Sequence, residues 1–480
     1  MQSLDTKPNN RGPVPLWRRA ILFLGIEMQG NEPVPAERQT DRRYMNLFTL
    51  WFSMNFNLIA LSTGMAGTLS YGLSLRDCSL IILFFGLLTA LAPPYLSLLG
   101  SMLGLRQMIH ARYAFGLYGA AIPLLLNMAT LAGFAILGCI LGAQALSAIN
   151  PAELSVNVGI VIIALINLII IFFGSQLIHK FDMFAWFPTL VAILVAVGCG
   201  GNKLHQQVEA APASVSAVFN FSALIAGFYL PWAAIASDFT TYFDRRSKKT
   251  SILVPSYLGL VTGGIPLMIM GAAIGGAVPN VPSWGDGYDT NSVGGVLGAM
   301  LQPTGRFGKF LLVILSLSVI ANMAGSVYAL TLNCQALFYL VRIRVPRVAY
   351  TIAVTAIILP VAMRVAAEFL ESLSNFLGII GYWPACFVAV VLVEHLVFRK
   401  GRVDNYNLGE WDIATSLPSG VAALSAAALS FALVVPSMSQ IWFTGPIAEK
   451  TGDIGFEMAF FVTYICHSER WKLELDVTSK

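Results

Sequence analysis

The sequence is poor in charged residues, and this excludes an ordinary soluble protein. Only 11% of its 480 residues are charged, whereas 56% are hydrophobic, and the mean hydropathy is +0.72. Soluble chains carry roughly 25% charged residues. The net charge of +4 also gives no reason to expect a nucleic-acid partner, because nucleic-acid binders cluster their basic residues on one face, and here they lie in short hydrophilic gaps.

Catalytic and metal-binding patterns are also missing. The five histidines are scattered without metal-ligand spacing, and the chain has no HExxH, GxSxG or P-loop motif. The six cysteines form no CxxC pair, so we expect small buried side chains and no disulfide framework. The first 20 residues lack the apolar core of a cleavable signal peptide. The sequence therefore predicts neither an enzyme nor a bound cofactor or metal.

Long apolar runs dominate the sequence. A spanning helix needs about 20 mostly apolar residues, and the runs predict an all-α polytopic membrane protein with twelve such helices. The last span is the shortest, and without it the count falls to eleven. The predicted spans are 46–72, 79–99, 118–147, 157–176, 183–201, 215–237, 251–278, 308–338, 347–363, 374–397, 415–436 and 453–466.

The basic residues support this order of spans. If the N-terminus lies inside and the spans alternate, 23 of the 29 Lys and Arg fall on the inner side, as expected for cytoplasmic loops. Both termini, in segments 1–45 and 467–480, are then cytosolic. No span is charged at its middle, where a charge costs roughly 3 kcal/mol. This favours a small neutral substrate over an ion channel or a voltage sensor.

Two spans contain clusters that weaken a helix. In the first span, Ser62 and Thr63 stand beside two glycines, shortly after Asn55-Phe56-Asn57; in the sixth, Pro231 precedes Trp232. Opened backbone in a membrane is tolerated only where it lines a cavity or is covered by protein. Breaks in spans 1 and 6 indicate two inverted five-helix repeats with a site between them. The alternative is that Gly and Pro are simply common in membrane helices.

The eighth span carries a polar stripe. Ser318, Asn322 and Ser326 recur every four residues and so share one helix face. An asparagine amide can both donate to and accept from the edge of a heterocycle. The stripe predicts substrate contact, with hydrogen-bonded helix packing as the alternative. In span 3, Gly138 and Gly142 form a GxxxG motif that indicates close helix packing.

From about residue 25 onward, a series of blocks resembles the fungal-type purine–cytosine permeases of the nucleobase–cation symporter-1 family. The resemblance covers nearly the whole chain. The blocks are Gly25–Glu27, Glu37-Arg38, Asn46–Asn55, Gly104–Met108, Arg112-Tyr113, Phe115-Gly116, Ser237–Thr240, Leu317–Asn322, Asn375–Trp383, Glu394–Leu396 and Gly445–Ala448.

This resemblance implies a LeuT-type fold, with repeats at 46–201 and 215–397 and two further helices within 398–466. It also implies alternating-access uptake of cytosine, adenine, guanine and hypoxanthine with a co-transported proton across the plasma membrane. By position it implies that Trp232 stacks on the base and Asn322 hydrogen-bonds its edge, with Ser62 and Thr63 in the broken first span. Asp238 and Glu394 are candidates for proton coupling.

Three positions depart from the family pattern. Met323 and Gly325 replace an asparagine and a proline in span 8, and Gly138 replaces a residue that is commonly asparagine. Another base or a larger heterocycle, such as a form of vitamin B6, therefore stays open as the substrate. Sodium-coupled relatives carry adjacent hydroxyl residues in span 8, whereas here Ser316 precedes a leucine, which favours protons. A non-transporting membrane sensor is the alternative from another class. The oligomeric state is not predicted.

Overall fold

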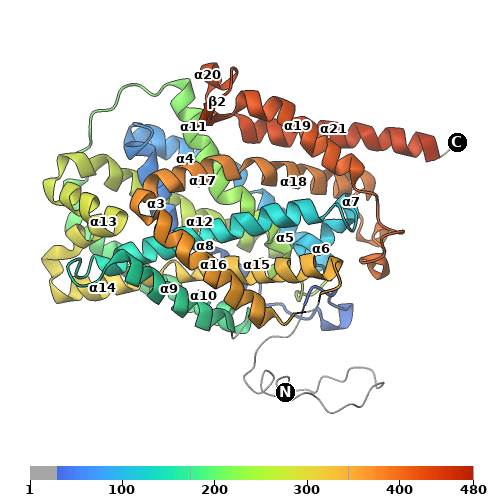
Figure 1. The fold of residues 1–480 in the computed structure, drawn as a ribbon, viewed down its shortest axis with the longest axis horizontal. Coiled ribbons are helices and arrows are strands. Elements are labelled where there is room, and N and C mark those ends of the chain that lie inside the picture. The colour runs from blue at the N-terminus through green and yellow to red at the C-terminus, as the bar shows by residue number, and fades with distance from the viewer. Residues whose placement is uncertain (1–29, 173–174, 344, 479–480) are drawn as a thin grey trace, which may run out of the picture.

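The computed structural model describes residues 30–172, 175–343 and 345–478, and these form a helical bundle with one short hairpin (Figure 1). This confirms the all-α fold. Within this part of the chain, seven helical segments are long and apolar enough to cross a membrane, and three shorter helices are also apolar. The total of twelve spans stays a prediction.

The first predicted repeat is built from helices in chain order, two of them interrupted. They are α2 (Met45–Asn55) and α3 (Leu58–Leu69), α4 (Leu75–Thr89) and α5 (Ala92–Leu103), α8 (Ala121–Ser147), α9 (Val156–Phe172) and α10 (Ser175–Gly200). Two short helices, α6 (Gln107–His110) and α7 (Arg112–Phe115), connect α5 to α8.

The second predicted repeat follows the same plan. It comprises α11 (Val215–Tyr229) with the 3-10 turns η3 (Leu230–Ala234) and η4 (Ala236–Phe239), α12 (Lys249–Ala277), α14 (Arg306–Leu317) and α15 (Ile320–Leu340), α16 (Arg347–Val365), and α17 (Phe369–Ile380) and α18 (Tyr382–Leu392). Helix α13 (Pro282–Leu301) connects α12 to α14. No span was predicted there, because this stretch is rich in glycine and polar residues.

The contacts made by helices of the first repeat have counterparts among the helices of the second. Helices α2 and α3 pack on α12, while α11 and its 3-10 turns pack on α4 and α5. Helix α2 also contacts α10, as α11 contacts α17, and α8 contacts α9, as α15 contacts α16. Such paired contacts are expected of inverted repeats. They place the breaks of spans 1 and 6, between α2 and α3 and between α11 and η4, inside the bundle.

Two glycines let backbones touch at these contacts. A Cβ on Gly64 of α3 would collide with the carbonyl of Met268 on α12, and a Cβ on Gly227 of α11 would collide with the carbonyl of Leu377 on α17. Small residues allow this close approach in membrane bundles. The interrupted spans are therefore held tightly by the helices around them.

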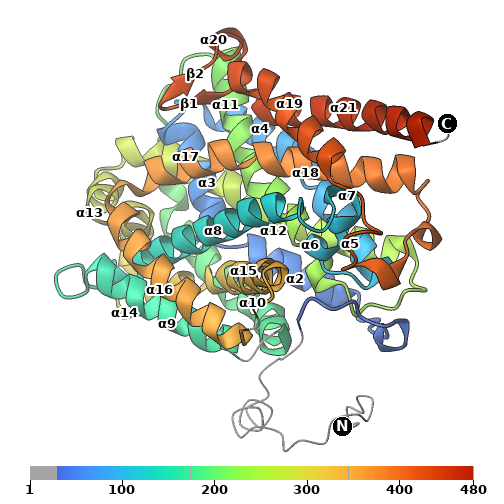
Figure 2. The ribbon, with the colours of Figure 1, turned by 45° about the vertical axis from the view of Figure 1, so that its right-hand side comes forward.

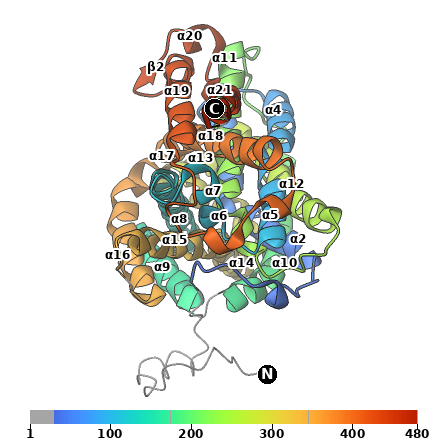
Figure 3. The same ribbon diagram turned by 90° about the vertical axis from the view of Figure 1, so that its right-hand side faces the viewer.

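The C-terminal part lies along one edge of the bundle. Helix α19 (Val421–Ser437) leads to a hairpin of β1 (Ser439–Gln440) and β2 (Phe443–Thr444), then α20 (Ala448–Thr451) and α21 (Gly455–Thr478). Helices α19 and α21 run side by side, and α21 packs on α18 (Figures 1 and 3). The last and shortest predicted span, 453–466, therefore falls almost entirely within the long helix α21.

Large apolar side chains cover much of the outer surface. Leu80 and Phe84 on α4, Ile122 and Leu125 on α8 and Ile169 on α9 are each at least half exposed. Soluble proteins rarely expose contiguous apolar patches of this kind. The protein is therefore an integral membrane protein.

Candidate functional site

The first span breaks at Phe56 and Asn57, in the first part of the predicted cluster, whereas the second part, Ser62 to Gly67, lies inside the unbroken helix α3. Helix α2 ends at Asn55, and Asn57 has an extended backbone (φ −153°, ψ 177°). Its side-chain oxygen accepts from the backbone N–H of Ile59 at 2.8 Å and so caps α3. Its amide nitrogen donates to the carbonyl of Met54 at 2.7 Å. The Asn57 side chain therefore hydrogen-bonds to both α2 and α3, the two helices that flank the break.

The sixth span breaks at Pro231, also as predicted. Proline disrupts an α-helix because it lacks a backbone donor, and α11 gives way to η3 just before it. Trp232 is fully buried. Its ring stacks on Phe134 of α8, with centroids 5.1 Å apart and 27° between the planes, and meets Trp51 of α2 edge-on at 6.2 Å.

Asn322, near the start of α15, connects span 8 to the first break. Its Nδ2 donates to the carbonyl of Met54 at 2.9 Å. This is the carbonyl that also accepts from Asn57. The predicted residues Trp232 and Asn322 therefore both reach the end of α2. We call Trp51, Met54, Phe134, Trp232 and Asn322 the central cluster.

Several buried polar atoms in and beside this cluster have no hydrogen-bond partner among the described residues. They include Nε1 of Trp51, Nε1 of Trp232, Oδ1 of Asn322 and Oγ of Ser326. Buried polar groups are nearly always paired. Two ring donors, an amide acceptor and a hydroxyl suit a flat ligand with both donors and acceptors on its edge.

The other predicted hydroxyl groups, those of Ser62, Thr63 and Ser318, donate to nearby backbone carbonyls. Ser62 donates to the carbonyl of Leu58 and Thr63 to that of Ile59, each at 2.7 Å. A two-residue turn separates α14 from α15, and Ser318 in that turn donates to Leu315 at 2.7 Å. All of these hydroxyl residues are buried. Their contact with a substrate stays a prediction.

The residues that depart from the family pattern are packed against methionines. A Cβ at Gly138 would lie 2.5 Å from Cγ and 2.9 Å from Sδ of Met323. A Cβ at Gly325 would lie 2.5 Å from Cε of Met54. The long side chains of Met323 and Met54 therefore occupy the space next to these two glycines. Thioether chains are flexible and adapt to irregular shapes.

Asp238 lies one residue beyond the predicted end of span 6 and ties η4 to α6. Its Oδ1 accepts from the backbone N–H of Gln107 at 2.8 Å, and the Ser237 hydroxyl donates to Oε1 of the same glutamine at 2.7 Å. Arg106 donates to the carbonyl of Asp238 at 3.1 Å and to the hydroxyl of Tyr328 on α15 at 3.2 Å.

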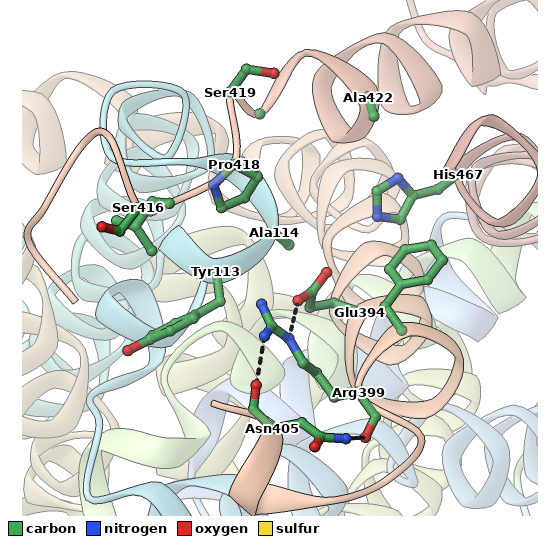
Figure 4. Close-up of a pocket in the computed structure, with 13 residues that line it drawn as sticks. Tyr113, Ala114, Glu394, Arg399, Asn405, Ser416, Pro418, Ser419, Ala422 and His467 are labelled. Atoms are coloured by element: carbon green, nitrogen blue, oxygen red, sulfur yellow. Dashed lines mark hydrogen bonds and ion pairs between the residues drawn. The ribbon is translucent and has the colours of Figure 1, made fainter. Parts of the chain in front are cut away.

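Glu394 lies elsewhere, in the π-helical turn Val393–Phe398. Its Oε1 accepts from Nε of Arg399 at 2.7 Å, and Arg399 also donates to the carbonyl of Asn405 at 2.6 Å (Figure 4). These residues line a cavity of about 390 Å³ that His467 also borders. The structure does not bring Glu394 into the central cluster.

Sequence reasoning missed three members of the central cluster. Phe134, Trp51 and Met54 were not predicted as site residues. Spacing could have identified two of them. Phe134 lies one helical turn before Gly138, and Trp51 lies one turn before Asn55, so each shares a helix face with a residue that the sequence had singled out. The stacking of Phe134 on Trp232 brings together residues from spans 3 and 6, and spacing within a span does not predict such a contact.

Comparison with known proteins identifies the family to which this chain is similar. A family model described as permease for cytosine/purines, uracil, thiamine and allantoin matches residues 33–456. A purine-cytosine permease of Emericella nidulans is 32% identical over 458 residues, which cover 94% of this chain and 89% of the relative. A purine-cytosine permease of Saccharomyces cerevisiae is 32% identical over 472 residues. A vitamin B6 transporter of the same yeast is 26% identical over 502 residues, 93% of this chain and 86% of the relative.

Among solved structures, the fold is similar to that of Mhp1, a nucleobase-cation-symport-1 family transporter in a closed conformation with bromovinylhydantoin bound. The TM-score is 0.72 at 15% identity, and the match covers 93% of this chain and 96% of the other. A Na⁺-coupled sialic acid symporter matches with a TM-score of 0.59 at 12% identity over 95% of each chain. These likenesses establish the transporter fold.

Proposed function

This chain belongs to the family of permeases for cytosine/purines, uracil, thiamine and allantoin, and from that premise we propose that it takes up nucleobases together with protons across the plasma membrane. It is a membrane transporter and not an enzyme. The proposed substrates are cytosine, adenine, guanine and hypoxanthine, carried by alternating access. Its environment is the lipid bilayer, with both termini in the cytosol.

The central cluster supports this proposal most directly. Trp232 offers an indole face next to unpartnered polar atoms of Trp232 and Asn322. A flat heterocycle that displaces Phe134 from Trp232 would replace that contact with its own ring stacking, worth about 1 kcal/mol. Its edge would then pair with Oδ1 of Asn322. Ser62, Thr63, Ser318 and Ser326 are the further proposed contacts.

Two observations support proton coupling. Asp238 is a buried carboxyl that links η4 of the broken sixth span to α6, next to the guanidinium of Arg106. Ser316 donates to the carbonyl of Val313 on its own helix and is followed by Leu317, so the adjacent hydroxyl pair of sodium-coupled relatives is absent. Glu394 is the second candidate, and its ion pair with Arg399 favours a structural role.

A form of vitamin B6 is the second candidate substrate. The observation in its favour is the packing of Met323 beside Gly138, because a deformable thioether replaces polar amide groups there. A wall of this kind tolerates a ring with alkyl or hydroxymethyl substituents. A relative of this chain is a vitamin B6 transporter, which agrees with this possibility.

Uptake measurements test the proposal. The full chain is expressed in cells without their own permeases, and radiolabelled cytosine, adenine, guanine, hypoxanthine and pyridoxine are offered in turn. Asn322→Ala should weaken apparent affinity roughly 5- to 150-fold, because a lost hydrogen bond to a buried polar group costs about 1–3 kcal/mol. Trp232→Ala should weaken every ring substrate alike, whereas Asn322→Ala should change their ranking.

The matched control is Asn333→Ala, which removes another buried amide three turns along the same helix, α15. It should reach the membrane and leave affinity unchanged. Unaltered affinity of Asn322→Ala for every substrate would exclude Asn322 from the site. No uptake of any compound by the wild-type chain would favour the non-transporting sensor.

A further inference from the structure

A second polar pocket lies away from the central cluster and is lined by residues of α11, α17 and the β1–β2 hairpin and by the two residues that follow α3. Figure 2 shows the arrangement of these elements in the bundle. Its volume is about 240 Å³. In the predicted topology, every segment that contributes to this pocket lies at the outer side of the membrane. We call it the outer pocket, and its lining residues are Ser70, Tyr71, Asn220, Ser374, Asn375, Gly378, Ser439, Gln440, Ile441 and Asp453.

A buried carboxylate organises one wall of the outer pocket. Asp453 is 1% exposed and accepts from the hydroxyl of Tyr382, the side-chain amide of Gln440 at 3.0 Å and the backbone N–H groups of Ser439 and Gly455. Gln440 also donates to the Tyr382 hydroxyl at 2.7 Å. With its acceptor capacity taken up, Asp453 acts as a positioning residue that fixes the polar groups around it.

Neutral polar groups form the rest of the wall. Asn220 accepts from the backbone N–H of Asp453 at 2.8 Å through Oδ1, which leaves its NH₂ group for the pocket. Oγ of Ser374 is buried without a hydrogen-bond partner in the described part of the chain. Asn375 adds a second amide, and Tyr71 adds an aromatic ring. This combination suits a small neutral ring that both donates and accepts hydrogen bonds.

Helix α17 connects the outer pocket to the central cluster. Ser374 and Asn375 line the pocket, while the next residue, Phe376, meets Phe134 edge-on with centroids 5.4 Å apart and planes at 89°. Phe134 is the residue that stacks on Trp232. The same helix therefore lines the outer pocket with Ser374 and Asn375 and contacts the aromatic stack of the central cluster with Phe376.

We propose that the outer pocket is a binding site for the transported heterocycle, occupied before the molecule reaches the central cluster. This rests on the proposed function, since the occupant is the transported substrate. Asn220, Ser374 and Asn375 hydrogen-bond its edge, and Tyr71 covers its face. Binding there concentrates the substrate at the outer end of α17, next to the side chains that must separate for it to enter.

Substrate protection of an introduced thiol tests the proposal. Asn375→Cys in the full-length chain is labelled with a membrane-impermeant methanethiosulfonate, with and without saturating cytosine, adenine or pyridoxine. The same substitution is also made together with Asn322→Ala, which weakens the central site. Thr444→Cys, exposed on the hairpin outside the pocket lining, is the matched control, and unsubstituted protein measures labelling of native cysteines. Ser374→Cys replaces Asn375→Cys if that variant fails to reach the surface.

The expected result is loss of labelling at Asn375→Cys in both backgrounds with a transported compound, and unchanged labelling at Thr444→Cys. If protection disappears with Asn322→Ala, the thiol was shielded by a conformational change that follows substrate binding at the central cluster. That result would overturn the outer site. Absence of protection in both backgrounds would also overturn it. Uptake is measured in parallel, so a chain that transports none of the compounds refutes the proposed function, whereas transport without protection refutes only the outer pocket.

Discussion

Gly138→Ala should destabilise the protein, and removal of the Met323 side chain should relieve that effect. The added Cβ would lie 2.5 Å from Cγ and 2.9 Å from Sδ of Met323, closer than van der Waals contact between carbon atoms. Overpacking of this kind costs about 1–3 kcal/mol. Because Met323 is 1% exposed, its side chain can move only by displacing its neighbours.

Met323→Ala alone should destabilise by about 2–5 kcal/mol, since truncation of a buried methionine leaves a cavity. In the double variant the new methyl group enters that cavity. The double variant should therefore be more stable than the sum of the single effects by about 0.5–3 kcal/mol, as is typical of residues in contact. Unfolding of the purified full-length chain in mixed detergent micelles gives the four free energies of the cycle.

A matched control is Gly198→Ala, because no atom lies within 4 Å of a Cβ built at that glycine. It should show no coupling to Met323→Ala. The contact argument would be refuted if the Gly138 and Met323 effects added within about 0.3–0.5 kcal/mol, the usual limit for independent sites. Met323→Asn should raise uptake of cytosine and purines if the thioether has replaced a base-reading amide.

Three further outcomes are expected. Reporter tags at residues 5 and 478 should both be protected in intact cells, and a surface-accessible C-terminal tag would indicate eleven spans. Replacing sodium by choline at constant pH should leave uptake unchanged, and a collapse of uptake would show sodium coupling. In proteoliposomes, Asp238→Asn replaces the carboxylate that accepts from the backbone N–H of Gln107, which weakens this charge-assisted bond and should make efflux fast at every pH. Wild-type efflux should speed up as the pH on the Asp238 side is lowered, and a variant that keeps the wild-type pH profile would remove Asp238 from gating.

Features local in the chain could be predicted from the sequence. Pro231 disrupts its own helix, so the interruption of the sixth span was predicted at the right residue. The interruption of the first span was also predicted, but it lies at Phe56 and Asn57, while the glycines beside Ser62 and Thr63 stay helical because α3 packs tightly on α12. Helix α13 was not predicted, because hydropathy detects spanning helices and this connection is polar and rich in glycine. The same limit left its counterpart in the first repeat, α6–α7, without a predicted role.

Contacts between spans could not be predicted. Trp232 and Asn322 were predicted separately, and their common attachment to the end of α2 depends on how three spans pack. Gly138 and Met323 were each noted as departures, but neither span indicates that one side chain fills the space beside the other. The sequence specified which groups were available, and packing determined which of them meet.

The Asp453 network has a consequence for the order in which the chain can be assembled during synthesis. Asp453 is 71 residues beyond Tyr382 and 233 residues beyond Asn220, so α11 and α18 enter the bilayer before their shared partner has left the ribosome. Until then, the Tyr382 hydroxyl and the Asn220 side chain, near the outer ends of these two helices, lack the partner that Asp453 provides, and the bilayer interior offers no water in its place. A chain that terminates before Gln440 would leave the Tyr382 hydroxyl without either Asp453 or Gln440, and cellular quality control should recognise it even though most of its apolar helices are present.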